Sequence, residues 1–373
     1  MKVGLNATCL NDRPSGAKQR FVGIYRELVA LAPEIEFVVY EPSDCNVASW
    51  FQGAPNVTAR KTPVPSQGRL SKVLNGLGYW RAELARQRFD ILEGMNLPLV
   101  TSPVGRNLLT IHDLRCLQPE AGKLERLVFK AALTRALHAA DHVVTVSESM
   151  KKAILNFNPG IGVSVVYNGM SSGSTAPLSL EDVAAFQEKF AIVGGYVLAV
   201  GHNEARKNYP RLIDAMARLH ARGIERNLVI IGNDSGERDA LEQRIQARGL
   251  AGRVQMLSGL SDLEVRCAYA SCGLFVFPSS YEGFGIPILE AMAAGRPIVL
   301  SNIDVFREIT QGQGIYFAPT DDEQMALSIE QVLLNREEQE RIIAYGNSRL
   351  TEFSYRHLAS RMMVIYQSLQ ESV

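Results

Sequence analysis

The sequence predicts an α/β protein of two Rossmann-like, doubly wound domains that face a common cleft. Short apolar runs of strand length alternate with helical stretches along the whole chain, a pattern typical of parallel sheets covered by helices on both faces. The runs form two series, separated by a small, polar, linker-like segment at residues 171–177. At 373 residues the chain also exceeds one ordinary core.

The elements are expected in the following order. Strands of the first series are predicted at residues 3–8, 35–40, 91–93, 108–111, 142–146 and 163–167, and those of the second at 196–200, 228–231, 254–257, 274–276, 297–300 and 314–317. Helices between them include 21–30, 212–222, 237–248 and 262–270, and a last helix at 357–370 is long enough to cross back to the first domain. We therefore expect domains at 1–170 and 171–355, with a C-terminal helix within 356–373 packed on the first.

Composition excludes several classes of protein. No run of about 18 apolar residues is present, so no transmembrane helix is expected, and the N-terminus has the pattern of a strand rather than of a signal peptide. Five scattered cysteines suit reduced thiols in the cytosol. With 39 basic and 39 acidic residues the chain is neutral and is not a general nucleic-acid binder.

Charge is distributed unevenly along the chain. Residues 1–170 carry 20 Lys and Arg against 14 Asp and Glu, and the remainder is acidic. Within this basic half, residues 69–88 combine arginines and a lysine with leucines, a tyrosine and a tryptophan. Such a segment either lies peripherally on an anionic membrane, here the inner face of the cytoplasmic membrane, or is a surface helix packed on its own core. Gly76 and Gly78 weaken a continuous helix there.

Two glutamates eight positions apart are the most informative motif. Glu282 lies on a glycine-rich loop, and Glu290 lies about one turn into the helix that follows. Pro287 suits the first position of that helix, and Gly295 supplies its stop signal.

The start of this helix is a candidate anion site. The N–H groups of Phe284, Gly285 and Ile286 are expected to be free there, and the positive end of the helix dipole favours a phosphate. A phosphate cradle flanked by two carboxylate acceptors suits a sugar nucleotide, whose ribose and hexose both present hydroxyl donors.

Further candidate residues follow other predicted strands. Arg206 and Lys207 come after the strand at 196–200 and can grip phosphate oxygens. His112 and Asp113 come after the strand at 108–111, where the histidine can donate to a sugar hydroxyl or the pair can cap the next segment. Gly16, between the first strand and its helix, lets the backbone approach a ligand.

With these motifs the sequence resembles the glycosyltransferase family 4 enzymes of the GT-B fold. Residues 282–290 look like their Glu-x7-Glu signature, and Arg206-Lys207-Asn208 looks like their donor-diphosphate motif. Ile111-His112-Asp113, Val146-Ser147-Glu148 and residues 166–169 match further landmarks in the expected order.

The resemblance implies a retaining hexosyl transfer from a nucleoside-diphosphate sugar. It assigns the diphosphate and leaving group to Arg206 and Lys207, the ribose to Glu290, and the transferred sugar to Glu282. It adds His112 beside the sugar, and for the donor it adds Gly16, Phe284, Gly285, Ile286 and Leu289. The departing phosphate oxygen deprotonates the acceptor, so no protein nucleophile is required.

The resemblance also suggests partners. Mannose from GDP-mannose is the favoured donor, with dTDP- and UDP-sugars as alternatives, and the acceptor is a glycan or lipid-linked glycan of a surface polysaccharide such as lipopolysaccharide. No cofactor is expected, and because Asp-x-Asp is absent no catalytic metal is expected either.

Two departures from the family pattern are visible. The loop after the first strand, around Gly16, is poorer in glycine, and His202 stands near where some members carry an arginine. A sugar-nucleotide epimerase and a catalytically silent sugar-nucleotide-binding partner remain as alternative functions.

Overall fold

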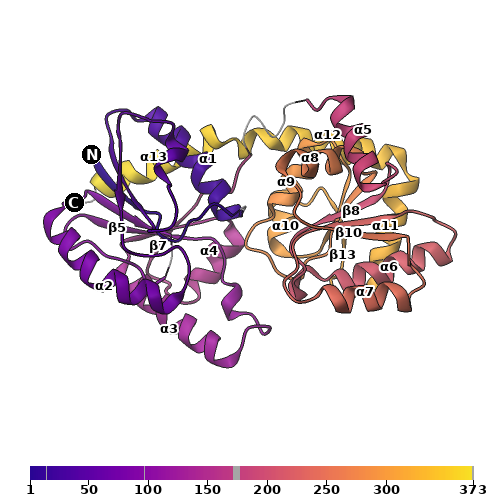
Figure 1. Ribbon diagram of the computed structural model, residues 1–373, viewed down its shortest axis with the longest axis horizontal. Coiled ribbons are helices and arrows are strands. Elements are labelled where there is room, and N and C mark those ends of the chain that lie inside the picture. The colour runs from indigo at the N-terminus through magenta and orange to yellow at the C-terminus, as the bar shows by residue number, and fades with distance from the viewer. Residues whose placement is uncertain (14, 96, 171–176, 372–373) are drawn as a thin grey trace. The chain divides into compact units, whose positions relative to one another are not determined.

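The chain folds into two compact units. The computed structural model describes residues 1–13, 15–95, 97–170 and 177–371 (Figure 1). Unit 1 comprises Met1–Gly169 together with the chain from Phe353 onward, and unit 2 comprises Met170–Glu352. The chain thus passes between the units after Gly169 and again before Phe353, close to the positions 170 and 355 expected from sequence.

Unit 1 is built on a seven-stranded parallel sheet with strand order β3-β2-β1-β4-β5-β6-β7. Its elements are β1 (Lys2–Asn6), α1 (Gly16–Leu31), β2 (Glu36–Glu41), η1 (Ala48–Phe51), β3 (Val57–Lys61), α2 (Arg69–Arg86), β4 (Ile91–Gly94), β5 (Arg106–Ile111), η2 (Arg115–Leu117), α3 (Lys123–Ala139), β6 (His142–Thr145), α4 (Glu148–Leu155), β7 (Gly162–Val165) and α13 (Tyr355–Glu371). β3 is an edge strand of mostly exposed polar residues, which is why no apolar run predicted it.

One face of this sheet is covered by the two ends of the chain. The C-terminal helix α13 lies beside α1 (Figure 1), which confirms the predicted return to the first domain. The two helices share a core with β1 and β2 that includes Phe21, Tyr355 and Tyr366. Gly23 makes the contact close, because a Cβ there would lie 2.2 Å from the Tyr355 ring.

The helix α2 packs on the core with one side only. Trp80 and Leu84 are buried against Tyr40 of β2 in a second cluster of unit 1. α2 is continuous through Gly76 and Gly78, so the expected weakening does not interrupt it. No helix in the described part of the chain is long and apolar enough to cross a membrane.

Unit 2 repeats the design with a six-stranded parallel sheet of order β10-β9-β8-β11-β12-β13. Its elements are α5 (Leu180–Phe190), β8 (Val197–Val200), η4 (Ala205–Lys207), α6 (Tyr209–Ala221), β9 (Leu228–Ile231), α7 (Arg238–Ala247), β10 (Val254–Leu257), α8 (Asp262–Ser271), β11 (Leu274–Phe277), α9 (Ile286–Ala293), β12 (Ile298–Ser301), α10 (Asp304–Ile309), β13 (Ile315–Phe317), α11 (Asp322–Leu334), α12 (Arg336–Arg349) and η5 (Leu350–Phe353). Both sheets confirm the predicted pair of doubly wound domains.

Candidate functional site

A cluster of two cations and two carboxylates lies at the carboxyl edge of the unit 2 sheet. Arg206 and Lys207 form the short helix η4 after β8, and Glu282 lies on the loop after β11. β8 and β11 are hydrogen-bonded neighbours and run parallel, so the loops that follow them meet at one edge. The fourth member, Glu204, precedes Arg206 by two residues and was not among the residues singled out from sequence.

Glu282 binds both cations through the same oxygen. Its Oε1 lies 2.7 Å from Lys207 Nζ and 2.8 Å from Arg206 Nη1. The Lys207 and Glu282 side chains are only 7% and 12% exposed. A charge-assisted pair so shielded from water is far less weakened by salt than a surface pair.

Lys207 has little freedom to move. Its ammonium lies 4.7 Å from the centre of the Phe277 ring, a cation–π distance. Gly201 leaves room for the lysine stem, because a Cβ at that position would come within 2.7 Å of Lys207 Cε. The amine is therefore held by Glu282 and the Phe277 ring, and the missing side chain of Gly201 makes space for its stem.

The charges of the cluster support one another. Burial by itself raises the pKa of Glu282, but Lys207 and Arg206 outweigh burial and hold that pKa below its usual value. The pKa of Arg206 is raised, because Glu282 and Glu204 outweigh the lowering effect of burial. Burial lowers the pKa of Lys207, with Glu282 opposing the shift. Glu282 is therefore ionised at neutral pH.

The loop from Glu282 leads into the helix α9. Gly285 caps this helix at φ 154°, Ile286 is its first residue and Pro287 its second, one position later than expected. The backbone N–H groups of Gly285 and Ile286 find no acceptor among the described residues. These two amides at a helix start keep the character of an anion cradle.

The remaining predicted residues of α9 and of the loop before it are more enclosed. Leu289 is fully buried, and the Phe284 side chain is 4% exposed, so both side chains belong to the packing of unit 2. Glu290 accepts a 2.8 Å hydrogen bond from the Tyr269 hydroxyl, and burial raises its pKa although Tyr269 opposes the shift. Tyr269 was not anticipated from sequence, where nothing marks it as a partner of Glu290.

His112 and Gly16 belong to unit 1, so the units hold separate parts of the predicted site. His112 follows β5, and burial together with the charge of Arg20 lowers its pKa to about 3. It is therefore neutral at physiological pH. Gly16 is the first residue of α1, whose N-cap Ser15 accepts from the Lys18 N–H, so the helix begins five residues before the predicted start at residue 21.

Two buried groups of unit 1 were not predicted from the sequence. The Arg20 guanidinium donates to the carbonyl of Val166 at 2.6 Å and to that of Tyr167. Glu93 is fully buried and accepts hydrogen bonds from Tyr366 and Thr110 at 2.7 and 2.6 Å. Because these partners lie far apart in sequence, no local pattern could have indicated them.

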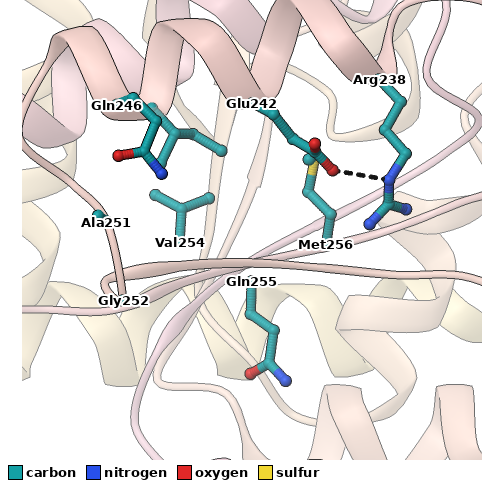
Figure 2. A pocket seen from close by; sticks show the side chains of 9 residues that line it. Arg238, Glu242, Gln246, Ala251, Gly252, Val254, Gln255 and Met256 are labelled. Carbon is teal, nitrogen blue, oxygen red and sulfur yellow. Dashed lines mark hydrogen bonds and ion pairs between the residues drawn. The ribbon is translucent and has the colours of Figure 1, made fainter.

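A separate cavity of about 280 Å³ lies between α7 and β10. Figure 2 shows residues that line it, among them the ion pair of Arg238 and Glu242 and the side chains of Val254 and Met256. None of the predicted site residues lines it. Among the described residues no group of three or more His, Cys, Asp or Glu side chains is placed to hold a metal ion.

Two family descriptions match successive parts of the chain. Residues 14–172 match Glycosyltransferase Family 4, and residues 185–349 match Glycosyl transferases group 1. The first match falls almost entirely within unit 1 and the second within unit 2.

Named proteins show the same relationship. Over 269 residues the chain is 29% identical to O-antigen chain mannosyltransferase B of Escherichia coli, covering 71% of each chain. It is 28% identical to O-antigen chain mannosyltransferase RfbU of Salmonella typhimurium, covering 62% of each. The crystal structure of Anabaena HepE in complex with UDP and glucose matches with a TM-score of 0.74 at 19% identity, covering 99% of this chain and 100% of that one.

Proposed function

We propose that this chain, which belongs to the group 1 glycosyltransferases of family 4 and shares their GT-B fold, transfers mannose from GDP-mannose with retention of configuration. The acceptor is a glycan or lipid-linked glycan. The observation that carries the proposal is the cluster at the ends of β8 and β11, where Arg206 and Lys207 share one oxygen of Glu282.

Each part of the cluster fits one part of a sugar nucleotide. Two cations suit a diphosphate, and the amides of Gly285 and Ile286 add donors for a phosphate or sugar oxygen. Ionised Glu282 accepts from a hexose hydroxyl, and Glu290 accepts from the ribose.

The chemistry then rests on the leaving group. The bond between the anomeric carbon and the phosphate oxygen breaks while the acceptor oxygen bonds to that carbon on the same face. The acceptor proton passes to the departing phosphate oxygen. Arg206 and Lys207 stabilise the negative charge that develops on the diphosphate, a contribution of about 3 kcal/mol for a single well-placed donor.

The choice of mannose is supported by the relatives, two of which are named O-antigen chain mannosyltransferases. A UDP-sugar is the main alternative donor, because HepE was solved with UDP and glucose. A dTDP-sugar is the third.

Thermal-shift measurements with GDP, UDP, dTDP and their sugars test this order, because a ligand that binds only the folded state raises its stability by mass action. We expect the largest shift with GDP-mannose, and a larger shift with a UDP- or dTDP-sugar would overturn the choice.

Product analysis separates the remaining functions. Incubated with GDP-mannose and a lipid-linked acceptor, a transferase yields a mannosylated acceptor and GDP. An epimerised sugar nucleotide formed without acceptor would indicate an epimerase, and donor binding without turnover on any acceptor would indicate a silent partner.

We also propose that transfer is independent of a metal, since Arg206 and Lys207 already supply two cations for the diphosphate. Full loss of transfer in EDTA, restored by a divalent cation, would contradict this.

We further propose that unit 1 contacts an anionic lipid surface. On α2, Leu74 and Leu77 are 68% and 69% exposed, and on α3, Leu124 and Leu127 are 76% and 66% exposed. Exposed basic residues lie on or beside the same helices, namely Arg81, Arg86, Arg88, Lys123 and Lys130. Apolar side chains bordered by cations suit a bilayer interface with anionic headgroups.

Vesicle flotation tests this contact. We expect the wild-type chain to float with vesicles containing phosphatidylglycerol, and Leu74→Ser/Leu77→Ser and Leu124→Ser/Leu127→Ser each to weaken flotation. Leu334→Ser in unit 2, at a position 70% exposed, is the matched control and should float like the wild type. Equal flotation of all variants, or none by the wild type, would refute the lipid contact.

A further inference from the structure

Arg206 is held by two carboxylates at once. Its Nε lies 2.7 Å from Glu204 Oε2, and its Nη1 lies 2.8 Å from Glu282 Oε1. Nη1 also donates to the carbonyl of Tyr281 at 3.4 Å. The Arg206 and Glu204 side chains are 20% and 25% exposed, so the pair is largely shielded from solvent.

The guanidinium of Arg206 has a fixed set of N–H donors, so the donors already bound to protein groups determine which ones a ligand can use. The group is planar and presents five N–H bonds in a rigid fork. Glu204 takes the Nε donor, while Glu282 and Tyr281 take Nη1. Nη2 makes no hydrogen bond to any residue that the structure describes. The two N–H groups of Nη2 are thus the donors of Arg206 that are available to a ligand, and the contacts with Glu204 and Glu282 fix their direction.

Binding of a sugar nucleotide would affect Glu204 and Glu282 differently. The four-residue cluster has two positive and two negative charges and is neutral as a whole. An incoming diphosphate competes with Glu282 for both cations, because Glu282 Oε1 lies between them. Glu204 contacts only the Nε edge of Arg206. When the donor binds, we therefore expect the contact between Glu204 and Arg206 to remain, while Glu282 exchanges its contacts with the cations for a hydrogen bond to a sugar hydroxyl.

We propose that Glu204 is a positioning residue that keeps the Arg206 guanidinium oriented toward the donor diphosphate. This inference rests on the proposed sugar-nucleotide donor and adds a residue that acts on it through Arg206. A positioning role has two opposed components. The carboxylate charge disfavours an approaching phosphate, whereas the hydrogen bond to Nε favours binding by holding the fork in place.

Two substitutions separate these components. Glu204→Gln removes the charge but keeps an oxygen that accepts from Nε–H, and Glu204→Ala removes both. We expect calorimetric titration with GDP and with UDP to give the Gln variant a Kd equal to or below that of the wild type. We expect the Ala variant to bind the preferred nucleotide about tenfold more weakly than the Gln variant, as the loss of one hydrogen bond to a charged group implies.

A control and a kinetic readout complete the experiment. Glu242→Gln breaks the ion pair with Arg238, which has a similar length of 2.9 Å in the same unit, and should leave nucleotide binding unchanged (Figure 2). In transfer assays the Ala variant should raise the donor KM relative to the Gln variant with kcat little altered.

Three results would overturn the inference. Equal Kd values for the Ala and Gln variants would show that the hydrogen bond to Arg206 positions nothing. A fall in kcat at unchanged KM would place Glu204 in the chemical step instead. Failure of the wild-type protein to bind any of GDP, UDP, dTDP or their sugars would overturn the proposed donor itself, and the inference with it.

Discussion

Removing Glu282 should destabilise unit 2 more than removing Lys207, although the two form one ion pair. At 2.7 Å the gross attraction between them is about 6 kcal/mol with an effective dielectric constant near 20, most of it offset by desolvation. What decides stability is the charge left behind. Lys207→Met leaves Glu282 paired with Arg206 at 2.8 Å, so no buried charge is orphaned.

Glu282→Gln has the opposite consequence. It leaves Lys207, 7% exposed, without a carboxylate, while Arg206 still has Glu204. Leaving one partner of a buried pair uncompensated costs about 3 kcal/mol in a fully buried site, and about 2 kcal/mol is expected in this slightly exposed one. For a domain of this size the loss corresponds to a fall in Tm of roughly 4–8 °C, against about 2 °C or less for Lys207→Met.

The double variant is the decisive comparison. In Lys207→Met/Glu282→Gln both charges are gone, so its Tm should lie above that of Glu282→Gln alone. Differential scanning calorimetry of the four proteins measures the coupling as a double-mutant cycle. Additive losses, or a Lys207→Met variant as unstable as Glu282→Gln, would refute the view that Glu282 is the shared anchor of both cations. All three variants should lose transfer activity.

Two further predictions concern the fold. Hydrogen bonds from Lys189 and from Ser261 at the N-terminus of α8 lower the pKa of Glu264 from 4.5 to about 2. The stabilising contribution of Glu264 is therefore complete above pH 4.5 and is lost as the pH falls toward 2. Glu264→Gln should flatten the acid dependence of stability between these pH values, and an unchanged profile would contradict this. Gly23→Ala would place a Cβ 2.2 Å from the Tyr355 ring. We therefore expect urea titration to show that the free energy of unfolding falls by about 1–3 kcal/mol. A variant as stable as the wild type would show that α1 and α13 do not pack this closely.

The fold could largely be predicted because buried parallel strands leave a local signal. The apolar runs at 228–231 and 254–257 coincide with β9 and β10. The edge strand β3 was missed, since its exposed residues form no apolar run. The effect of Gly76 and Gly78 was misjudged because Trp80 and Leu84 hold α2 on the core, and tertiary packing outweighs helix propensity.

The candidate site was predictable only in part, for a related reason. Arg206, Lys207 and Glu282 each follow a buried strand, and the rule that parallel strands end at one edge brings them together. Glu204 and Tyr269 are known as partners of Arg206 and Glu290 only from distances in the folded chain. Their own neighbours in sequence do not reveal the pairing.

We propose that the cluster at the ends of β8 and β11 binds the donor diphosphate. The most direct test is calorimetric titration of GDP into the wild-type protein and into Arg206→Gln/Lys207→Met, with folding of both checked by calorimetry. We expect the double variant to bind at least about a hundredfold more weakly, since each lost charge-assisted contact contributes about 1.5–3 kcal/mol. Equal affinity of the two proteins for GDP would show that Arg206 and Lys207 do not bind the diphosphate.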